Sequence, residues 1–248
     1  MSQINSKDDL IKYFKSSFKK ENQLKIGVEH EKFLYKEKNK RISFKEVYKI
    51  FKSLQKFSWK PIKENNVIIA LIKNKKKITL EPGNQIELSG APLKNIHLNC
   101  KESYQFLYEL KKVSLEHKLK MTSVSFDAFS KLKDIPKNPK ARYTIMDKEM
   151  PKDGKLSLEM MYKTTGTQIN LDFVSEIDFT KKFKLISHLV PISIGIFANS
   201  PFKENKLNGY LSYRSKVWQQ TSRGGLPISF LEDMNFEKYI DFSINLPL

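Results

Sequence analysis

Acidic and amide side chains, spaced two residues apart on short apolar runs, are the residues of this sequence best suited to chemistry. The first run, KIGVEHEKFLY, carries Glu29 and Glu31, and the second, ITLEPGNQIELSGAP, carries Glu81 and Glu87. Residues i and i+2 of a β-strand point to the same face of a sheet. If these runs are strands, each one aims a row of oxygen atoms at one side. Several converging rows would make an oxygen cage for a hard cation such as Mg²⁺.

A third run, GTQINLDF, carries Gln168 and Asn170 at the same spacing. Their amides would share one face of a strand, as the carboxylates of the first run do. The pattern does not fix the side-chain direction of Glu81, because Pro82 and Gly83 interrupt its strand. A plain alternative for all these residues is an exposed strand surface with ordinary salt bridges.

The spacing of apolar residues predicts the elements that carry these runs. Helical spacing or length predicts helices over 7–20, 43–57, 99–119 and 176–190. Short apolar runs predict strands at 25–35 and at VIIALI, KITLE and QIELS. The last three strands follow one another with tight connections, which predicts an antiparallel meander.

The remaining segments are less regular. Residues 131–155 are rich in Pro, Lys and Asp and are predicted to be irregular, and 157–174 is predicted to be a strand or strand pair ending in TQINLDF. Residues 199–227 hold most of the later Gly, Pro and Asn and are predicted to be loops. No internal repeat or low-complexity linker divides the chain. The sequence therefore predicts an α+β fold with a single domain over residues 1–248.

The net charge is +18, from 45 basic and 27 acidic residues. Such a charge suits a nucleic-acid or membrane surface. The lysines, however, are spread along the whole sequence and no nucleic-acid-binding motif accompanies them. Lys75 to Lys77 are predicted to form a solvated hairpin turn. No apolar run reaches the ~18 residues of a membrane-spanning helix. We therefore expect neither a specific nucleic-acid partner nor a membrane partner.

Cysteine usage and the first residues bear on the compartment. The single cysteine, Cys100, cannot form a disulfide within the chain. The opening residues, MSQINSKDDLIKYF, contain two aspartates and lack the apolar stretch of a secretory signal. These features favour a reducing compartment, and we expect the cytoplasm.

Several common catalytic motifs are absent. The sequence has neither the GxxxxGK[ST] loop nor the GxGxxG turn that binds phosphates in many nucleotide-binding proteins. His30 and Glu31 begin like the HExxH zinc motif, but Leu34 stands at the position of the second histidine. A zinc protease of that class is therefore excluded. If the protein binds ATP, it does so through metal ions and scattered basic groups.

Six stretches give the sequence a specific resemblance. They read GVEHEKF, TLEPGNQIELSGAPL, ARYTIMDKEMP, TQINLDF, IFANSPF and NGYLSYRSKVW. In these stretches, and in their order, the chain resembles glutamate–cysteine ligase of the plant and proteobacterial type, in the glutamine-synthetase-like superfamily of carboxylate–amine ligases. The resemblance implies a curved antiparallel sheet whose concave face holds Mg²⁺, ATP and substrate, with helices packed on the outer face. The meander and the paired carboxylates agree with this.

The resemblance also implies a reaction. Such ligases phosphorylate the γ-carboxylate of glutamate with ATP, and the amine of cysteine then displaces the phosphate, as the first step of glutathione biosynthesis. Mg²⁺ ions on carboxylates would bridge the phosphate oxygens and stabilise their charge. The metal ligands implied in this way are Glu29, Glu31, Glu81 and Glu87.

Substrate-binding residues are implied by the same motifs. Arg142 and Arg214 match arginines that bind the amino-acid substrate, a role that suits the bidentate guanidinium group. Trp218, four residues after Arg214, is expected to line the same pocket, with core packing as the alternative. Thr167 is a further candidate of this kind.

Two other roles complete the implied site. Gln168 and Asn170 match positions that face the metal or the nucleotide, so the resemblance implies that they bind ATP, the co-substrate. Arg214 and Glu87 are expected to be the catalytic residues.

Members of the family are considerably longer than this chain, so the resemblance implies a catalytic domain that is incomplete at its C-terminus. A sheet that lacks strands leaves an unpaired edge and exposed apolar surface, which predicts self-association. Two alternatives to the ligase function therefore stay open. One is a sister carboxylate–amine ligase with another amine acceptor, and the other is an inactive or partner-dependent fragment.

Overall fold

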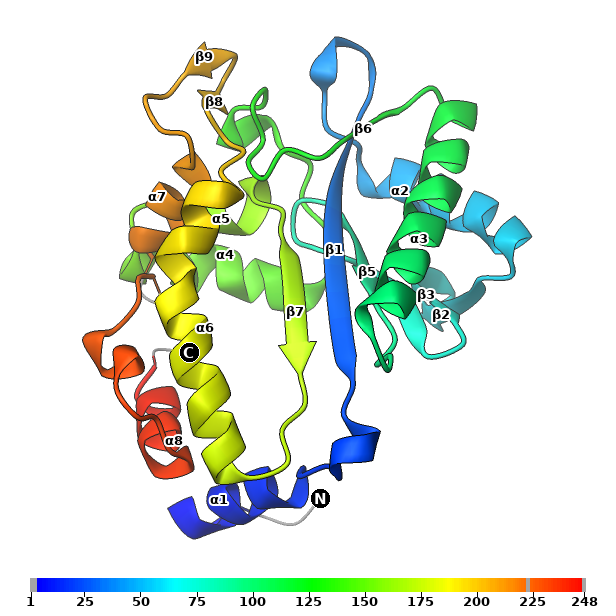
Figure 1. Ribbon diagram of the computed structural model, residues 1–248. Helices are drawn as coiled ribbons and strands as arrows, with labels where there is room; N and C mark the ends of the chain where they lie inside the picture. Colours follow the sequence, from blue (N-terminus) through cyan, green and yellow to red (C-terminus); the bar gives the residue numbers. More distant parts are fainter. Residues whose placement is uncertain (1–3, 222–223, 247–248) are drawn as a thin grey trace.

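The structure, a computed structural model, describes residues 4–221 and 224–246, and an antiparallel sheet lies at its centre (Figure 1). The strands of this sheet are β1 (Ile26–Tyr35), β2 (Lys60–Glu64), β3 (Val67–Lys73), β4 (Lys76–Leu80), β5 (Ile86–Ser89), β6 (Lys120–Thr122) and β7 (Thr167–Leu171). Their order is β2-β3-β4-β5-β1-β6, and β7 also pairs with β1. A separate small hairpin consists of β8 (Phe202–Lys203) and β9 (Lys206–Leu207).

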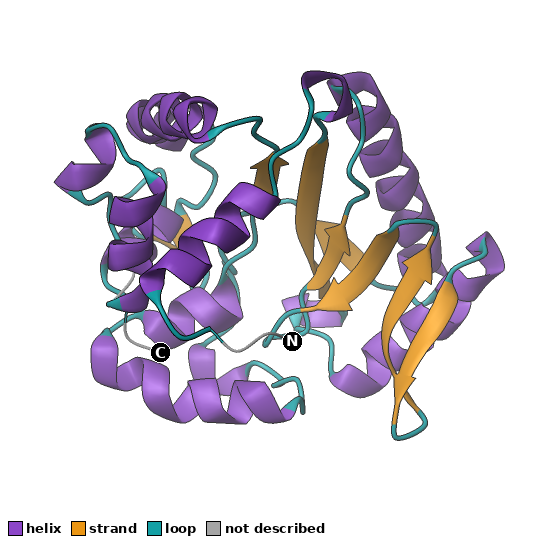
Figure 2. Cartoon of the chain, turned by 90° about the horizontal axis from the view of Figure 1, so that it is seen from below, coloured by secondary structure: helices purple, strands orange, loops and turns teal. Residues whose placement is uncertain are grey.

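The helices form two groups on either side of the sheet, as Figure 2 shows. One group follows the first half of the sequence: α2 (Phe44–Leu54) and α3 (Ile96–Glu116). The other group contains α1 (Lys7–Ser16), α4 (Ala141–Asp153), α5 (Ser157–Lys163), α6 (Glu176–Ile196), α7 (Tyr213–Gln219) and α8 (Phe236–Ile244). The predicted α+β class and the antiparallel meander are both confirmed.

Alternation of buried and more exposed residues along β4 and β5 gives this part of the sheet one apolar and one polar face. The apolar face packs against α2 and α3, where Ile78, Leu80, Ile86 and Leu88 join a core of fully buried side chains. Removing this much apolar surface from water is the main source of stability for such a layer. The odd-numbered residues of the same strands point the other way, so the carboxylates expected to do chemistry lie on the polar face.

The second group of helices partly closes the polar side. Arg142 lies in the first turn of α4, and Arg214 lies in the first turn of α7. Aromatic side chains tie together α1, α6 and α8, where the ring of Phe236 lies 5.0 to 5.9 Å from those of Phe14, Phe179 and others. Helices therefore cover the outer face, as expected, and further helices stand beside the face that carries the carboxylates.

Strand β7 is paired but poorly covered. It hydrogen-bonds to β1 alone among the described strands, and all five of its residues are exposed. Ile169 is 66% exposed and Leu171 is 43% exposed. The neighbouring helix α6 also presents apolar side chains to solvent, including Leu185 and Ile192. Exposed apolar surface of this kind marks a region that needs a partner.

Three predictions from the sequence were wrong in detail. Part of the segment 131–155 forms α4, whose Pro151 lies in the last turn, where the missing N–H and the ring disturb few bonds. The N-terminal part of 157–174 forms α5 and only 167–171 is a strand. Within 199–227, residues 213–219 form α7. In each case prolines or short apolar runs hid a short helix that tertiary contacts stabilise.

Two smaller differences concern the meander. Lys76 and Lys77 belong to β4, and the solvated turn is confined to Asn74, which has a positive φ of 57°, and its neighbour Lys75. An additional strand, β2, pairs with β3. Within the described residues, no helix is both long and apolar enough to cross a membrane.

Candidate functional site

The register of three strands places the predicted glutamates in one row across the polar face. Glu31 of β1 pairs with Glu87 of β5, and Glu87 pairs on its other side with Thr79 of β4. Directly opposed residues of neighbouring strands have Cβ atoms about 5 Å apart. Two carboxylates and a hydroxyl therefore meet in this row, from segments separated by about fifty residues in the sequence.

A second row lies two residues further along the strands. In it, Glu29 of β1 pairs with Ser89 of β5 on one side and with Gln168 of β7 on the other. Asn170, two residues after Gln168, donates its amide to Glu29 over 3.1 Å. The predicted nucleotide-facing amides and the predicted metal ligand Glu29 therefore share one face.

Glu81 joins the first row although it lies outside β4. Its carboxyl group lies against Glu87 and near Glu31, and burial together with these two negative charges raises its pKa to about 7. Arg142 acts in the opposite direction from the start of α4. The side-chain direction that the sequence left open is thus toward the other carboxylates.

Glu31 is the second carboxyl group with a strongly shifted pKa. Burial raises its pKa to about 7, and the charges of Glu87 and Glu29 act in the same direction. The backbone N–H of Gly166 donates to Glu31 over 2.8 Å, and this bond and the charge of Arg214 oppose the shift. Crowded carboxylates with raised pKa values are typical of functional sites, since ion pairs that only stabilise a fold lower such values.

Arg142 stands beside this cluster at the N-terminal end of α4. Its guanidinium donates to the hydroxyl of Tyr143 over 2.7 Å, and that hydroxyl donates to the carbonyl of Leu80 over 2.8 Å. The hydrogen bond to Tyr143 and the nearby charges of Glu81 and Glu87 raise the pKa of Arg142. Its side chain is exposed, so its remaining N–H groups are free to meet an anion.

Arg214 approaches Glu31 from α7. Its Nε donates to the carbonyl of Thr165 over 3.1 Å, and its backbone N–H donates to Ser200 over 3.0 Å. Burial lowers the pKa of Arg214, and Glu31 acts against this shift. Trp218 lies one turn further along, with its ring 5.5 Å from the guanidinium carbon of Arg214. The indole N–H of Trp218 is buried and has no hydrogen-bond partner among the residues that the structure describes.

A cavity of about 480 Å³ adjoins Arg214 and separates it from α6. Its polar lining includes Glu31, Thr167 and Arg214, and its apolar lining includes Ile169 and Phe197. Polar groups that converge in a concave hollow beside a few apolar side chains are typical of small-molecule sites. Of the predicted substrate residues, Thr167 and Arg214 meet here, while Arg142 lies on the far side of the carboxylates.

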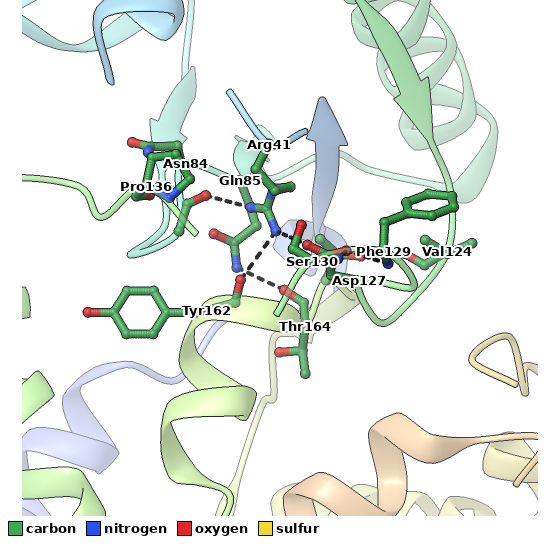
Figure 3. A network of polar contacts seen from close by, with 12 residues as sticks. Arg41, Asn84, Gln85, Val124, Asp127, Phe129, Ser130, Pro136, Tyr162 and Thr164 are labelled. Atoms are coloured by element: carbon green, nitrogen blue, oxygen red, sulfur yellow. Dashed lines mark hydrogen bonds and ion pairs between the residues drawn. The ribbon is translucent and has the colours of Figure 1, made fainter. Parts of the chain in front are cut away.

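The segment between Glu81 and Glu87 is held from the other side by a buried ion pair, shown in Figure 3. Arg41 pairs with Asp127 over 3.0 Å, both side chains being fully buried, and also donates to the carbonyl of Gly83 over 2.5 Å. Gln85 donates to the carbonyl of Thr164 over 3.0 Å. The residues between Glu81 and Glu87 are therefore held by buried contacts, while the two glutamates themselves lie at the polar face.

Oxygen-rich donors of this kind suit Mg²⁺, and the crowding of Glu31, Glu81 and Glu87 leaves negative charge that a divalent cation would compensate. In their present rotamers, no three acidic, histidine or cysteine side chains of the described residues stand close enough together to hold one ion. The donor chemistry thus fits Mg²⁺, and binding would require carboxylate side chains to turn toward the ion.

Sequence reasoning overlooked several residues of the polar face. Thr79 and Ser89 both donate hydroxyl hydrogen bonds to Glu87. Lys77 shares their face, opposite Ser89, and the amine of Lys140 lies 3.4 Å from the carbonyl of Leu80. Strand alternation would have found the first three, since they keep the phase of Glu81 and Glu87.

The sequence is similar to known proteins along nearly its whole length. The family model described as "Glutamate-cysteine ligase family 2 (GCS2)" matches residues 25–248. The chloroplastic glutamate–cysteine ligase A of Oryza sativa subsp. japonica is 43% identical over 253 residues, covering 100% of this chain and 51% of the rice protein. The chloroplastic enzymes of Medicago truncatula and Arabidopsis thaliana are 41% and 40% identical over 248 residues, covering 98% of this chain.

Two further facts follow from these matches. The chain spans about half the length of the curated relatives it matches. These relatives are named as chloroplastic, so the expectation of a cytoplasmic location was wrong. That expectation rested on cysteine usage and on the opening residues, and neither distinguishes one reducing compartment from another.

Proposed function

This chain belongs to glutamate-cysteine ligase family 2, and we propose that it carries out ATP-dependent ligation of the γ-carboxylate of glutamate to the amine of cysteine. The reaction would pass through a γ-glutamyl phosphate and supply the first step of glutathione biosynthesis. The observation that carries the proposal is the row of Thr79, Glu87 and Glu31 across the polar face, with Glu81 against it.

Charge compensation is the first task of such a site. Bound Mg²⁺ supplies positive charge to the phosphate oxygens of ATP. Glu29, Glu31, Glu81 and Glu87 are the residues proposed to hold it, and the amides of Gln168 and Asn170 lie on the same face for the nucleotide. The carboxylates would bind in their charged form, so the ion and the proton on Glu31 or Glu81 compete for the same oxygens.

Orientation of the substrate is the second task. The γ-carboxylate oxygen of glutamate attacks the γ-phosphorus of ATP and ADP leaves, and the cysteine nitrogen then attacks the acyl carbon and phosphate leaves. Arg214 would bind carboxylate or phosphoryl oxygens at the cavity, and its guanidinium, which lies beside the ring of Trp218, supports this role. Arg142 offers the same chemistry on the other side of the glutamates. Holding the reactants in line is a large part of catalysis in such transfers.

The rest of the family fold is the proposed partner of β7 and α6. The chain spans about half the length of its relatives, and β7 and α6 carry exposed apolar residues, of which Ile169 and Ile194 border the cavity. We expect residues 1–248, when isolated, to self-associate through this surface, which sedimentation velocity measures. A stable monomer at high micromolar concentration would contradict this expectation. Neither a specific nucleic acid nor a membrane is part of the proposal.

The direct test is product formation by residues 1–248 with Mg²⁺, ATP, glutamate and cysteine, followed by mass spectrometry. The double variant Glu31→Ala, Glu87→Ala should abolish γ-glutamylcysteine, whereas Glu116→Ala, on the exposed face of α3, should leave it unchanged. Replacing cysteine by other amines in the same assay tests a different acceptor.

Absence of product calls for a binding measurement. Mg²⁺-dependent binding of ATP without turnover would mean that the site needs the rest of the fold, which mixing with the other half of the rice relative should restore. Neither product nor Mg²⁺-dependent nucleotide binding, alone or in that mixture, would refute the proposed function.

A further inference from the structure

Glu87 differs from the other glutamates of the polar face in the way its carboxylate is held. The hydroxyl of Thr79 donates to Oε2 over 2.5 Å, and the hydroxyl of Ser89 donates to Oε1 over 3.1 Å. Each oxygen of the carboxylate therefore receives one neutral donor. Glu29 and Glu31, by comparison, each accept one bond, from Asn170 and from the backbone of Gly166.

The two hydroxyls reach Glu87 because the strands fix their positions. Thr79 lies directly opposite Glu87 on β4, and Ser89 follows it by two residues on β5. The neighbouring residues along the two strands, Ile78, Leu80, Ile86 and Leu88, are at most 1% exposed and lie in the core beneath the sheet. The backbone that carries both donors is therefore anchored, and neither hydroxyl can follow the carboxylate if it turns.

A carboxylate in this place has reason to turn away. Glu87 has Glu31 opposite it on β1 and Glu81 against it, and like charges at this distance repel each other. The hydroxyl hydrogen bonds hold the Glu87 carboxylate against this repulsion. Because hydroxyls are neutral, they leave its negative charge in place, whereas a lysine partner would neutralise it. An ionised carboxylate offers about four lone-pair sites, so the two hydroxyl bonds leave room for the neighbouring Glu81 and for a cation.

We propose that Thr79 and Ser89 are positioning residues that hold Glu87 toward the polar face, where its remaining lone pairs would meet the cation that accompanies the nucleotide. The inference rests on the proposed function and deepens it, because it concerns how the site is prepared for that cation. Partners that orient a metal ligand typically change metal affinity by about 10- to 100-fold when they are removed.

The test compares Thr79→Val, which removes the hydroxyl and keeps the shape, with Thr79→Ser, which keeps a hydroxyl. Mn²⁺ bound to residues 1–248 is measured by electron paramagnetic resonance, with and without ADP. We expect Thr79→Val to raise the dissociation constant of Mn²⁺ by about 10-fold, and Thr79→Ser to remain within about threefold of the wild type.

Two controls separate positioning from folding. Thr180→Val removes a hydroxyl that donates to the carbonyl of Met234 over 2.7 Å, far from Glu87, and should leave Mn²⁺ binding unchanged. In a Glu87→Gln background, Thr79→Val should add no further loss of Mn²⁺ affinity, because the hydroxyl acts through that carboxylate. An additional loss in that background would contradict the inference.

The outcomes distinguish this inference from the function beneath it. Unchanged Mn²⁺ affinity in Thr79→Val, with a folded protein and a wild type that binds Mn²⁺, would overturn the positioning role alone. A wild type that binds no Mn²⁺, with or without ADP and with the other half of the rice relative present, would overturn both the positioning role and the proposed function.

Discussion

The segment from Glu81 to Glu87 separates two groups of charged side chains that the fold treats differently. On one side, Arg41 and Asp127 form a fully buried pair that also binds the backbone of the turn at Gly83. On the other side, Glu81 lies against Glu87 with no cation in salt-bridge contact among the described residues, and its pKa rises to about 7. The same segment, residues 81–87, therefore contacts the buried ion pair on one side and carries the crowded glutamates on the other.

The difference teaches which part of the motif serves stability and which serves function. A buried charge that has its partner fixes the turn, and its loss is costly because the other charge stays behind. Carboxylates that face one another cost stability in the unbound protein, and natural proteins retain such costs mainly at functional sites. Mutation of the paired group, Arg41 and Asp127, should therefore lower the stability of the fold. Mutation of the crowded group, Glu31, Glu81 and Glu87, should mainly change ligand binding.

The largest expected effect is on the paired group. Arg41→Met should lower the free energy of unfolding by ~3–5 kcal/mol, because Asp127 would remain buried without its partner. Urea unfolding followed by circular dichroism measures the change. Lys152→Met, in the exposed pair with Glu149, should cost at most about 1 kcal/mol. Equal losses of stability in the two variants would mean that the buried pair of Arg41 and Asp127 is no more important to the fold than an exposed ion pair.

A methyl group at the turn should have the next largest effect. A Cβ at Gly83 would lie 2.7 Å from the carbonyl oxygen of Tyr162 and 2.9 Å from Oε1 of Gln85. Gly83→Ala should therefore destabilise the protein by ~1–3 kcal/mol. Gly195→Ala is the matched control, since nothing lies within 4 Å of its Cβ in helix α6, and it should stabilise by ~0.5–1 kcal/mol. Thermal unfolding of both variants should give changes of opposite sign.

The crowded group should show the reverse behaviour, with a dependence on pH. The pKa of Glu31 is raised from 4.5 to about 7, so the folded state binds this proton more tightly than the unfolded state does. Stability from this group is therefore present at low pH and is lost as the pH rises from about 4.5 through 7. Above pH 7, the charged carboxylate opposes folding.

Glu31→Gln should accordingly stabilise the protein at pH 8, by on the order of 1 kcal/mol after allowance for solvent screening. The advantage should shrink toward pH 5, where the wild-type carboxyl is protonated. Melting temperatures of the two proteins between pH 5 and pH 8 test this. A variant that is less stable than the wild type at pH 8 would show that Glu31 is paired rather than crowded.

Much of the polar face could be predicted because strand alternation is a local rule. The spacing of Glu29 and Glu31, and of Gln168 and Asn170, was enough to place each pair on one face. The spacing did not predict which residues of neighbouring strands would lie opposite each other. That depends on the register of β1 with β5 and β7, which joins distant segments and is set by the core and the turns.

Other parts were hidden for identifiable reasons. Thr79 and Ser89 resemble any strand hydroxyls until the register places them beside Glu87. Helix α4 was overlooked because Pro136 and Pro139 precede it and Pro151 lies in its last turn, so the composition of the segment suggested an irregular structure. The buried pair of Arg41 with Asp127 joins residues 86 positions apart, and no local pattern announces such a contact.

The smallest expected effect on stability separates the two groups most sharply. Asn170 is exposed on β7 and donates to Glu29, so Asn170→Ala should change the free energy of unfolding by less than about 0.5 kcal/mol. Asn245→Ala, which removes an exposed amide bonded to the carbonyl of Asp241, should cost about as little. Only Asn170→Ala should weaken Mg²⁺-dependent ATP binding, by about 10-fold, since only its amide borders a proposed metal ligand.

Calorimetric titration with ATP at fixed Mg²⁺, beside urea unfolding of the same samples, measures both quantities. Equal ATP affinities of the two variants would remove Asn170 from the site. We expect β7 to tolerate Asn170→Ala, because backbone pairing to β1 is the main support of this exposed strand. A large loss of stability in this variant would instead mean that the Asn170 side chain itself stabilises the fold. Small stability changes with a selective loss of binding would place the functional boundary along β7.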